Sequence, residues 1–164
     1  MSTPELRLDR KPFISLVDKA SHALSVDMVR EARARGYPFV RLAHNAVFGT
    51  LFGEGGRISD MAARAGITKQ SMGEVVRELV DVGVLEMSVD PDDRRAKVVT
   101  YTELGLEVTN GGRRYLETLE KLFADRFGEA DYEATRRVLE GVTELLARGG
   151  PADTNPDDAV GARG

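Results

Sequence analysis

The sequence contains no cysteine and no tryptophan, and it has only two histidines among 164 residues. The absence of cysteine excludes a disulfide framework, a thiolate metal site and a thiol-based redox switch within this chain. Two histidines without cysteine ligands are a weak basis for a metal site, so we expect neither a metal nor a cofactor. The composition is compatible with a reducing compartment, and we expect a cytoplasmic location.

Long apolar segments are absent as well. The chain has no run of about 18 apolar residues, the length that indicates a membrane-spanning helix. Residues 1–11 lack the apolar centre of a signal peptide. We therefore expect no membrane span, no secretion signal and no membrane partner. Aromatic residues make up only 6% of the chain, so the core is small and self-association could add to burial.

The net charge of −4 is unevenly distributed along the chain. Residues 1–56 carry eight basic and six acidic side chains, residues 57–100 carry seven and eight, and residues 101–164 carry eight and thirteen. None of these segments has the broad basic character on which non-specific DNA binding depends. A DNA-binding role would therefore rest on a few placed cations, and the central segment offers Lys69, Arg77, Arg94, Arg95 and Lys97.

Helical periodicity flanks the central segment on both sides. Apolar residues recur at helical spacing from Phe13 to Met28, and Gly36 is the expected end of this helix. A second helix is predicted over residues 40–51. Helical spacing returns after Glu103, and a last helix is predicted over residues 131–147.

Two glycines interrupt the helix that is predicted after Glu103, within the sequence Asn110-Gly111-Gly112. A glycine costs about 1 kcal/mol relative to alanine in a helix interior. We therefore expect a kink, a break or a hinge at this position.

The most specific pattern lies between Ile58 and Thr102. Ser59 is the predicted cap of a short helix over residues 60–65, and Gly66 follows it. Thr68 is the predicted cap of a longer helix over residues 69–82.

Two strands, 84–89 and 97–102, are predicted directly after this helix, joined by the turn residues Asp90-Pro91-Asp92-Asp93. Ile58 could add a short third strand. Two helices followed by a two-stranded hairpin are the layout of a winged helix, which presents one helix and one loop to a DNA duplex.

The helix predicted over residues 69–82 has two opposite faces. The face expected to enter a core carries Met72, Val75, Val76 and Leu79. The opposite, free face carries Gln70, Gly73, Glu74 and Arg77. Glutamine can pair with adenine, arginine suits guanine or a phosphate, and glutamate can accept from cytosine although it repels phosphate. Lys69 and Ser71 lie at the helix start, where free amides can face a phosphate. An ordinary amphipathic surface helix is the alternative interpretation.

Two adjacent arginines, Arg94 and Arg95, lie near the tip of the predicted hairpin. A narrow minor groove has an enhanced negative potential that attracts an inserted arginine. Asp93 could pair with Arg95 and fix its direction. A solvated charged turn is the alternative interpretation. The hairpin directly follows the helix predicted over residues 69–82, and this position favours DNA contact.

Two stretches resemble MarR-type transcriptional regulators. The sequence Asp90-Pro-Asp-Asp-Arg-Arg-Ala-Lys-Val-Val-Thr-Tyr-Thr-Glu-Leu-Gly105 is similar to the wing signature of that family, and residues 68–85 resemble its recognition helix. The resemblance implies that Asp93 and Arg95 form the Asp-x-Arg motif of the wing, that Arg95 enters the minor groove and that Arg94 contacts a neighbouring phosphate. Tyr101 departs from the pattern, which usually has leucine before the threonine.

The resemblance also implies an obligate homodimer whose N- and C-terminal helices intertwine, and a pseudo-palindromic operator in double-stranded DNA. Two-fold symmetry then predicts half-sites about one helical turn apart, roughly 34–36 Å. Many members of the family bind small, often aromatic, effectors between their two lobes. Five side chains could bind such an effector here: His22, Tyr37, Phe39, His44 and Phe48. Packing in the core is the alternative interpretation for each of them.

The predicted fold is mainly α-helical with a small β-hairpin. Residues 37–105 would form the winged helix-turn-helix DNA-binding lobe, and residues 12–36 with residues 106–148 a helical dimerisation lobe. Residues 1–11 and 149–164 are predicted to be a flexible N-terminus and a disordered tail. The residues predicted to contact DNA are Ser59, Thr68, Lys69, Gln70, Ser71, Gly73, Glu74, Arg77, Asp93, Arg94, Arg95 and Lys97.

These features together predict a dimeric, sequence-specific DNA-binding transcriptional regulator, most simply a repressor, whose activity a small molecule could relieve. A winged helix used only for protein–protein contact is one alternative, and it should tolerate loss of Arg95. A small enzyme is the other. The sequence has no phosphate-binding loop after a strand, no nucleophile elbow and no metal-spaced cluster, so we expect no catalytic activity.

Overall fold

The computed structural model describes residues 10–53, 55–91 and 93–149. Most of the predicted flexible N-terminus and disordered tail, namely residues 1–9 and 150–164, lies outside the described residues. The described residues up to Leu116 form one compact unit, and those from Glu117 onward form a second. Within the described ranges, no helix has the length and apolar character needed to span a membrane.

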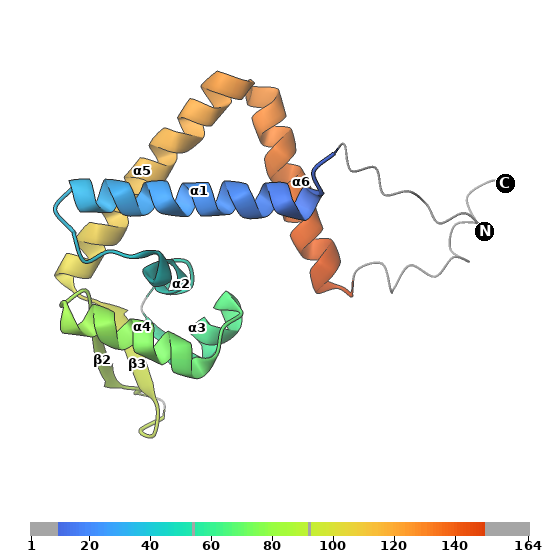
Figure 1. Ribbon diagram of the computed structural model, residues 1–164. Coiled ribbons are helices and arrows are strands. Elements are labelled where there is room, and N and C mark those ends of the chain that lie inside the picture. Colours follow the sequence, from blue (N-terminus) through green and yellow to red (C-terminus); the bar gives the residue numbers. More distant parts are fainter. Residues whose placement is uncertain (1–9, 54, 92, 150–164) are drawn as a thin grey trace. The chain divides into compact units, whose positions relative to one another are not determined.

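The elements of the chain are mainly helical (Figure 1). In chain order they are α1 (Phe13–Ala34), the 3-10 helix η1 (Leu42–His44), α2 (Asn45–Phe48), β1 (Gly56–Arg57), α3 (Ile58–Ala65), α4 (Lys69–Asp81), β2 (Leu85–Val89), β3 (Lys97–Tyr101), α5 (Glu103–Phe127) and α6 (Glu129–Ala147).

The three strands form one antiparallel sheet in the order β1-β3-β2. β2 and β3 pair from Leu85 opposite Tyr101 to Val89 opposite Lys97, which confirms the predicted hairpin. β1 pairs with β3 and supplies the expected third strand. Ile58 is not part of that strand, because it is already the first residue of α3.

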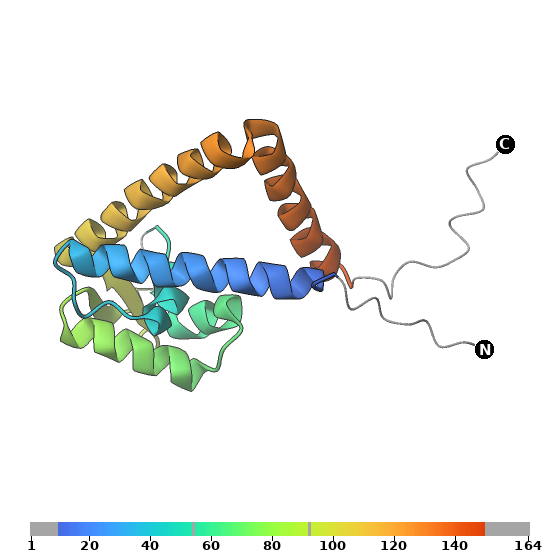
Figure 2. The same cartoon turned by 45° about the horizontal axis from the view of Figure 1, so that its top comes forward.

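The core of the first unit is centred on α4. Its apolar face is as predicted: Met72, Val76 and Leu79 are fully buried, and they pack with Met61 of α3 and Val99 of β3. Burial of side chains of this size contributes about 1.5–3 kcal/mol each relative to exposure. The opposite face of α4 lies on the side of this unit that faces away from α1 (Figure 2).

The C-terminal half of α1 belongs to the same unit. Val29 packs with Val40 and with Val108 of α5. The hydroxyl of Tyr115 donates a hydrogen bond to Asp27 Oδ2 at 2.5 Å, which adds a polar contact between α1 and α5.

The expected break at Asn110-Gly111-Gly112 does not occur, because α5 is a continuous helix from Glu103 to Phe127. Gly111 allows close packing instead. Arg35 Nη1 donates to the carbonyl of Gly111 at 2.5 Å, and a Cβ at Gly111 would lie 2.9 Å from that nitrogen. The side chain of Arg35, directly after α1, therefore packs against the backbone of α5 at Gly111, and glycine leaves room for it there.

The single helix predicted over residues 40–51 is also wrong, because this segment forms η1 and the one-turn helix α2. The ring of His44 accepts the backbone N–H of Arg41 at 3.3 Å, which favours a tight turn at this point. The hydroxyl of Thr50 donates to the carbonyl of Ala46 at 2.5 Å, at the end of the segment. Such local side-chain bonds compete with a longer regular helix.

Candidate nucleic-acid interface

The free face of α4 carries the exposed side chains of Gln70, Glu74 and Arg77. Gln70 Nε2 donates to Glu74 Oε1 at 3.2 Å along the helix. Within the described part of the chain, no hydrogen bond or ion pair engages the guanidinium of Arg77. This face therefore offers an amide, a carboxylate and an unpaired cation to solvent.

Gly73 lies between these side chains. A Cβ built at Gly73 would meet no atom within 4 Å, so the fold of the subunit does not require glycine here. The backbone at Gly73 is itself buried, whereas the space that a Cβ would occupy is open, so the glycine leaves a gap in the side-chain layer of the free face.

Thr68 caps α4 as predicted. Its Oγ1 accepts the backbone N–H of Ser71 at 3.0 Å, and the two hydroxyl oxygens lie 2.8 Å apart. These hydroxyls therefore fix the start of the helix, with the exposed Lys69 between them in sequence. The cap orients the first free amides of α4, which point along the helix axis towards solvent.

Ser59 does not cap α3, contrary to the prediction. Pairing of β1 with β3 keeps Arg57 extended, so the helix starts at the next residue, Ile58, which packs against the core. Ser59 is exposed in the first turn, and its hydroxyl donates to Asp60 Oδ1 at 3.3 Å.

The loop between β2 and β3 is closed by backbone contacts around Asp93. Asp93 Oδ1 accepts the backbone N–H of Arg95 at 3.0 Å, and the Asp93 carbonyl accepts that of Ala96 at 2.8 Å. Asp93 thus directs Arg95 through the main chain rather than through its guanidinium. The side chains of Arg94 and Arg95 are exposed, and Asp92 lies outside the described residues.

The ion pair that anchors this loop was not predicted from the sequence. Asp90, which is only 5% exposed, accepts from Arg57 Nε at 2.7 Å, and Arg57 Nη2 lies 2.6 Å from the same oxygen. The contact joins β1 to the end of β2, 33 positions apart. It raises the pKa of Arg57, because the carboxylate stabilises the cation. Arg57 directly precedes Ile58, which was expected to add a third strand, and no sequence pattern linked Arg57 to Asp90.

Thr102 connects the hairpin to α5. Its hydroxyl donates to the carbonyl of Gly83 at 2.5 Å and accepts the backbone N–H of Gly105 at 3.1 Å. A Cβ at Gly105 would lie 2.1 Å from the carbonyl oxygen of Val84. Glycine at position 105 therefore allows the first turn of α5 to pack against the backbone of Val84, which lies between α4 and β2.

The seven cations of residues 57–100 fall into two groups. Arg57 pairs with Asp90, and Arg64 donates to the carbonyl of Thr50 at 3.1 Å. Within the described ranges, no ion pair or side-chain hydrogen bond engages the other five, which are Lys69, Arg77, Arg94, Arg95 and Lys97. The structure thus places the cations selected from the sequence on α4 and on the hairpin, all of them exposed.

Solved structures of similar architecture define the fold. MarR has a TM-score of 0.69 at 21% identity, with coverage of 84% of this chain and 99% of that chain. PcaV from Streptomyces coelicolor, in complex with its natural ligand, has a TM-score of 0.63 at 20% identity, covering 89% and 99%. A MepR mutant from S. aureus bound to an oligodeoxyribonucleotide has a TM-score of 0.53 at 16% identity, covering 84% and 99%. The chain has the MarR-type winged-helix fold. No protein-family model matches the sequence, and no curated protein matches it.

The MarR-type fold of this chain contains a cavity of about 530 Å³ within the first unit. This volume lies in the range of small-molecule sites, roughly 300–1,000 Å³. Its lining is mainly apolar and comes from α1, the segment 37–53, Tyr101 and α5. Arg35 and Tyr115 are among its polar groups.

Two of the five proposed effector residues, Tyr37 and Phe48, line this cavity. The other three lie elsewhere in the MarR-type fold. Phe39 packs against the cores, with its ring centroid 6.1 Å from that of Tyr37, His44 is buried beside Glu78, and His22 is exposed on α1.

Tyr101 also lines the cavity, although it is not among the five residues that the sequence suggested for an effector site. Its hydroxyl is buried and has no hydrogen-bond partner within the described ranges. Burial raises the pKa of Tyr101 to about 12, so the hydroxyl stays protonated at neutral pH.

Proposed function

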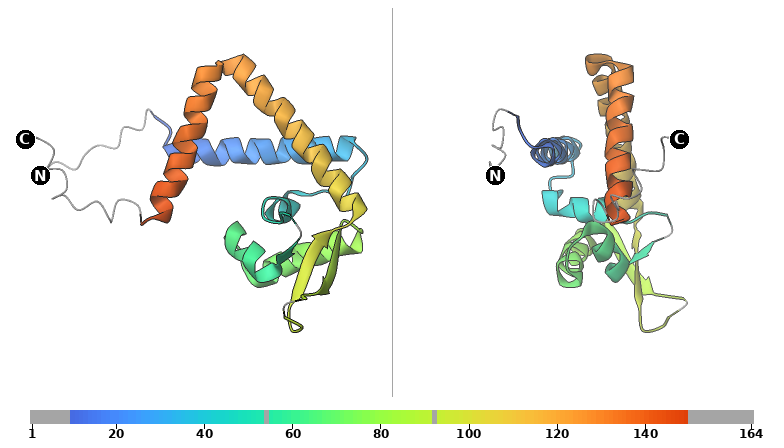
Figure 3. Two further views of the ribbon diagram at one scale, coloured as in Figure 1. Left: turned by 180° about the vertical axis from the view of Figure 1, so that it is seen from behind. Right: turned by 90° about the vertical axis from the view of Figure 1, so that its right-hand side faces the viewer.

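We propose that this protein is a homodimeric, sequence-specific DNA-binding regulator of transcription that acts as a repressor in the cytoplasm. One observation carries the proposal: the five unengaged cations of residues 57–100 are confined to α4 and the β2–β3 hairpin. Both elements lie on the side of the first unit that faces away from α1 (Figure 3). Placed cations of this kind supply the phosphate contacts and arginine contacts that a near-neutral protein needs on DNA.

In this proposal α4 enters the major groove. Its free face offers Gln70 to an adenine edge and Arg77 to guanine or a phosphate, and Glu74 can accept from a cytosine amine. Lys69 and the amides at the start of α4, together with the hydroxyls of Thr68 and Ser71, face a phosphate. Ser59 contributes from the exposed first turn of α3.

The hairpin then acts as the wing. Arg95 enters the adjacent minor groove, where the negative potential is strongest in narrow segments. Arg94 and Lys97 contact neighbouring phosphates. The backbone contact of Asp93 with Arg95, and the Arg57–Asp90 ion pair at the base, support this role because they limit the freedom of the loop before DNA binds.

A homodimer is supported by apolar side chains that remain exposed on the helices outside the winged helix. On α1 they include Phe13, Ile14, Leu16 and Val26, and in the second unit Leu122, Phe127, Val138, Leu145 and Leu146. Exposed apolar surface of this extent is typical of an interface. A two-fold symmetric dimer would match a pseudo-palindromic operator in double-stranded DNA.

A small aromatic effector is part of the proposal, with the cavity as its site and Tyr37 and Phe48 as two of its contacts. The mainly apolar lining and the volume support a ligand of this type. The similar structure of PcaV contains a natural ligand, and that of the MepR mutant contains DNA.

The test measures binding of the protein to the intergenic DNA beside its gene. Fluorescence anisotropy at several salt concentrations gives the affinity. We expect one specific complex whose affinity falls steeply with salt, because each neutralised phosphate contributes a slope of about −0.9 in log–log form. Light scattering should give twice the monomer mass of 17.9 kDa. A scrambled duplex of equal length is the control. Absence of salt-sensitive, specific binding at every neighbouring intergenic sequence would refute the proposal.

Gly73→Ala is expected to affect stability and DNA affinity in opposite directions. Because a Cβ at Gly73 meets no atom of the subunit, we expect the variant to be more stable than the parent by about 1 kcal/mol, the difference in helix propensity. If the major groove approaches this face, the added methyl group should weaken DNA binding at the same time. Thermal unfolding and anisotropy measure the two effects. A variant that gains stability and binds DNA as the parent does would contradict the close approach at Gly73.

A further inference from the structure

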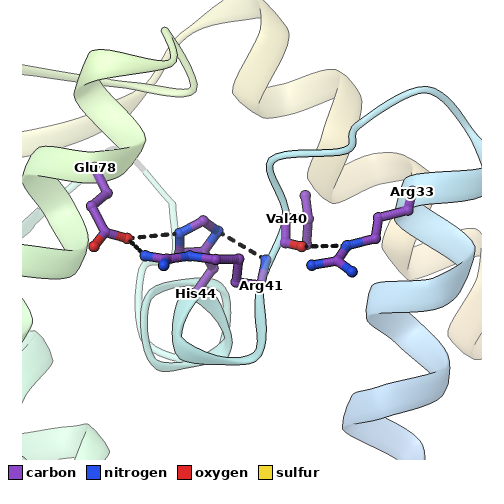
Figure 4. Close-up of polar contacts among 5 residues, drawn as sticks. All are labelled: Arg33, Val40, Arg41, His44 and Glu78. Atoms are coloured by element: carbon purple, nitrogen blue, oxygen red, sulfur yellow. Dashed lines mark hydrogen bonds and ion pairs between the residues drawn. The ribbon is translucent and has the colours of Figure 1, made fainter.

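A buried histidine connects η1 to α4 (Figure 4). The side chain of His44 is only 3% exposed, and its Nε2 lies 3.3 Å from Glu78 Oε2 on α4. The guanidinium of Arg41 contacts the same carboxylate oxygen. Glu78 is thus held by two side chains of one short segment, and both come from outside α4.

The segment that holds Glu78 is itself fixed on its other side. Arg33 Nε of α1 donates to the carbonyl of Val40 at 3.0 Å (Figure 4). Val40 is buried and packs with Val29 of α1 and Val108 of α5. Arg41 and His44 therefore contact Glu78 from a fixed base.

The contacts of His44 determine its protonation state. Nδ1 accepts the backbone N–H of Arg41 at 3.3 Å, so this nitrogen must carry a lone pair. The proton of the neutral ring is then on Nε2, where it can be donated to Glu78. A second proton would have to go on Nδ1, opposite a backbone N–H that can only donate, and the contact with Arg41 would be lost.

Glu78 follows Arg77 directly, about 100° further around the helix axis. Because a helix turns as a unit, a contact that fixes Glu78 also fixes the direction of Arg77. We infer that Arg41 and His44 are positioning residues that set α4 for DNA through Glu78, and that a proton on His44 loosens this setting. The inference rests on the proposed DNA-binding function, and it names a regulation of that function that the fold alone does not imply.

The charged groups around His44 come from the elements that pack against η1. Arg41 belongs to the same segment, Glu78 faces the ring from α4, Arg33 of α1 is engaged with Val40, and α2 has no ionisable side chain. Burial lowers the pKa of His44 from its ordinary value of 6.5, against the opposing effect of Glu78. Hydrogen bonds from Arg41 and then His44 lower the pKa of Glu78, so the carboxylate remains charged over the range in which His44 titrates.

The lowered pKa of His44 sets the sign of the pH effect on folding stability, whereas the weaker DNA binding at low pH rests on loss of the contact between Nδ1 and Arg41. A histidine whose pKa is lower in the folded state stabilises that state above its unfolded pKa of 6.5, and this stabilisation is lost as the pH falls towards the folded value. DNA binding is linked to this proton if the pKa of His44 is lower in the DNA-bound protein than in the free protein. A difference of one pKa unit would lower the affinity for DNA by up to about tenfold at low pH.

The experiment measures DNA affinity of the full chain from about pH 7.5 to about pH 5, with circular dichroism at each pH to verify the fold. The duplex is one that the parent protein binds at the higher pH. We expect the parent to bind up to about tenfold more weakly at the lower pH, and His44→Asn, which does not titrate, to show a flat profile. His22→Asn is the matched control, because it replaces the only other histidine, which is exposed, and it should keep the parent profile.

Glu78→Gln keeps the measurement informative if His44→Asn does not fold, because Glu78 is about half exposed. This variant should bind more weakly than the parent at the higher pH and should lose most of the pH dependence. A parent profile that is flat, or that persists in both His44→Asn and Glu78→Gln, would overturn the inference while leaving DNA binding intact. Absence of specific DNA binding by the parent at every pH would overturn the proposed function itself, and the inference with it.

Discussion

Arg95→Ala is expected to weaken binding to a specific duplex by about 1–3 kcal/mol, or roughly 5- to 150-fold in Kd. The loss is this large because the loop directs Arg95 before DNA arrives, through the backbone contact with Asp93 and the Arg57–Asp90 ion pair. The guanidinium is also not engaged by any ion pair within the described part of the chain, so no internal contact is lost when it enters the groove. Anisotropy titration of the parent and the variant measures the difference.

The salt dependence and a matched control identify the origin of this loss. Removing one cation from the interface should lower the magnitude of the log–log salt slope by about 1. Arg137→Ala changes the net charge by the same amount at an exposed position on α6, and we expect it to change neither affinity nor slope appreciably. Equal effects of the two variants would indicate a general charge effect. Unchanged binding by Arg95→Ala would instead favour a winged helix that contacts other proteins.

Gly105→Ala is expected to destabilise the protein by about 3 kcal/mol or more, since the added Cβ would lie 2.1 Å from the carbonyl oxygen of Val84. Neither the backbone of Val84 nor that of Gly105 can move easily. The hydroxyl of Thr102 binds both Gly83 and Gly105, and it ties the turn after α4 to the start of α5. Chemical denaturation monitored by circular dichroism measures the change in the free energy of unfolding.

Gly141→Ala is the control for this prediction. Gly141 lies inside α6, where a Cβ would meet no atom within 4 Å, so alanine should stabilise the helix by about 1 kcal/mol. The two substitutions make the same chemical change in a helix and are expected to have opposite signs. A Gly105→Ala variant as stable as the parent would show that the start of α5 is not packed against Val84 as the structure describes.

Local patterns were sufficient to predict α4 and the β2–β3 hairpin. The cap at Thr68 and the apolar positions Met72, Val76 and Leu79 defined the helix to within one residue at its end. Turn residues between two apolar runs predicted the β2–β3 hairpin. Each of these signals depends on residues close in sequence, which is why a single sequence contains them.

Contacts between distant residues account for what the sequence did not predict. Helix propensity at Gly111 and Gly112 indicated a break, but α5 is continuous, and the side chain of Arg35, 76 positions from Gly111, packs against its backbone there. Pairing of β1 with β3 moved the start of α3 from the position indicated by Ser59.

In the candidate site, too, local features were predicted and contacts between distant residues were not. The exposed cations of α4 and the wing were evident from sequence spacing, whereas the contacts that orient them were not. Asp90 and Arg57 are 33 positions apart, and Glu78 and His44 are 34 positions apart. Both pairs join elements that only the tertiary fold brings together, so no local pattern could have indicated them.

The most direct test of the central claim is selection of bound sequences from a random DNA pool with the full-length protein. We expect an enriched pseudo-palindrome whose two half-sites are about one helical turn apart, roughly 34–36 Å between centres. Such a result would establish specific DNA binding and two-fold symmetry in one measurement. A pool without any enriched motif, or with one that has no inverted repeat, would contradict specific DNA binding by a two-fold symmetric dimer.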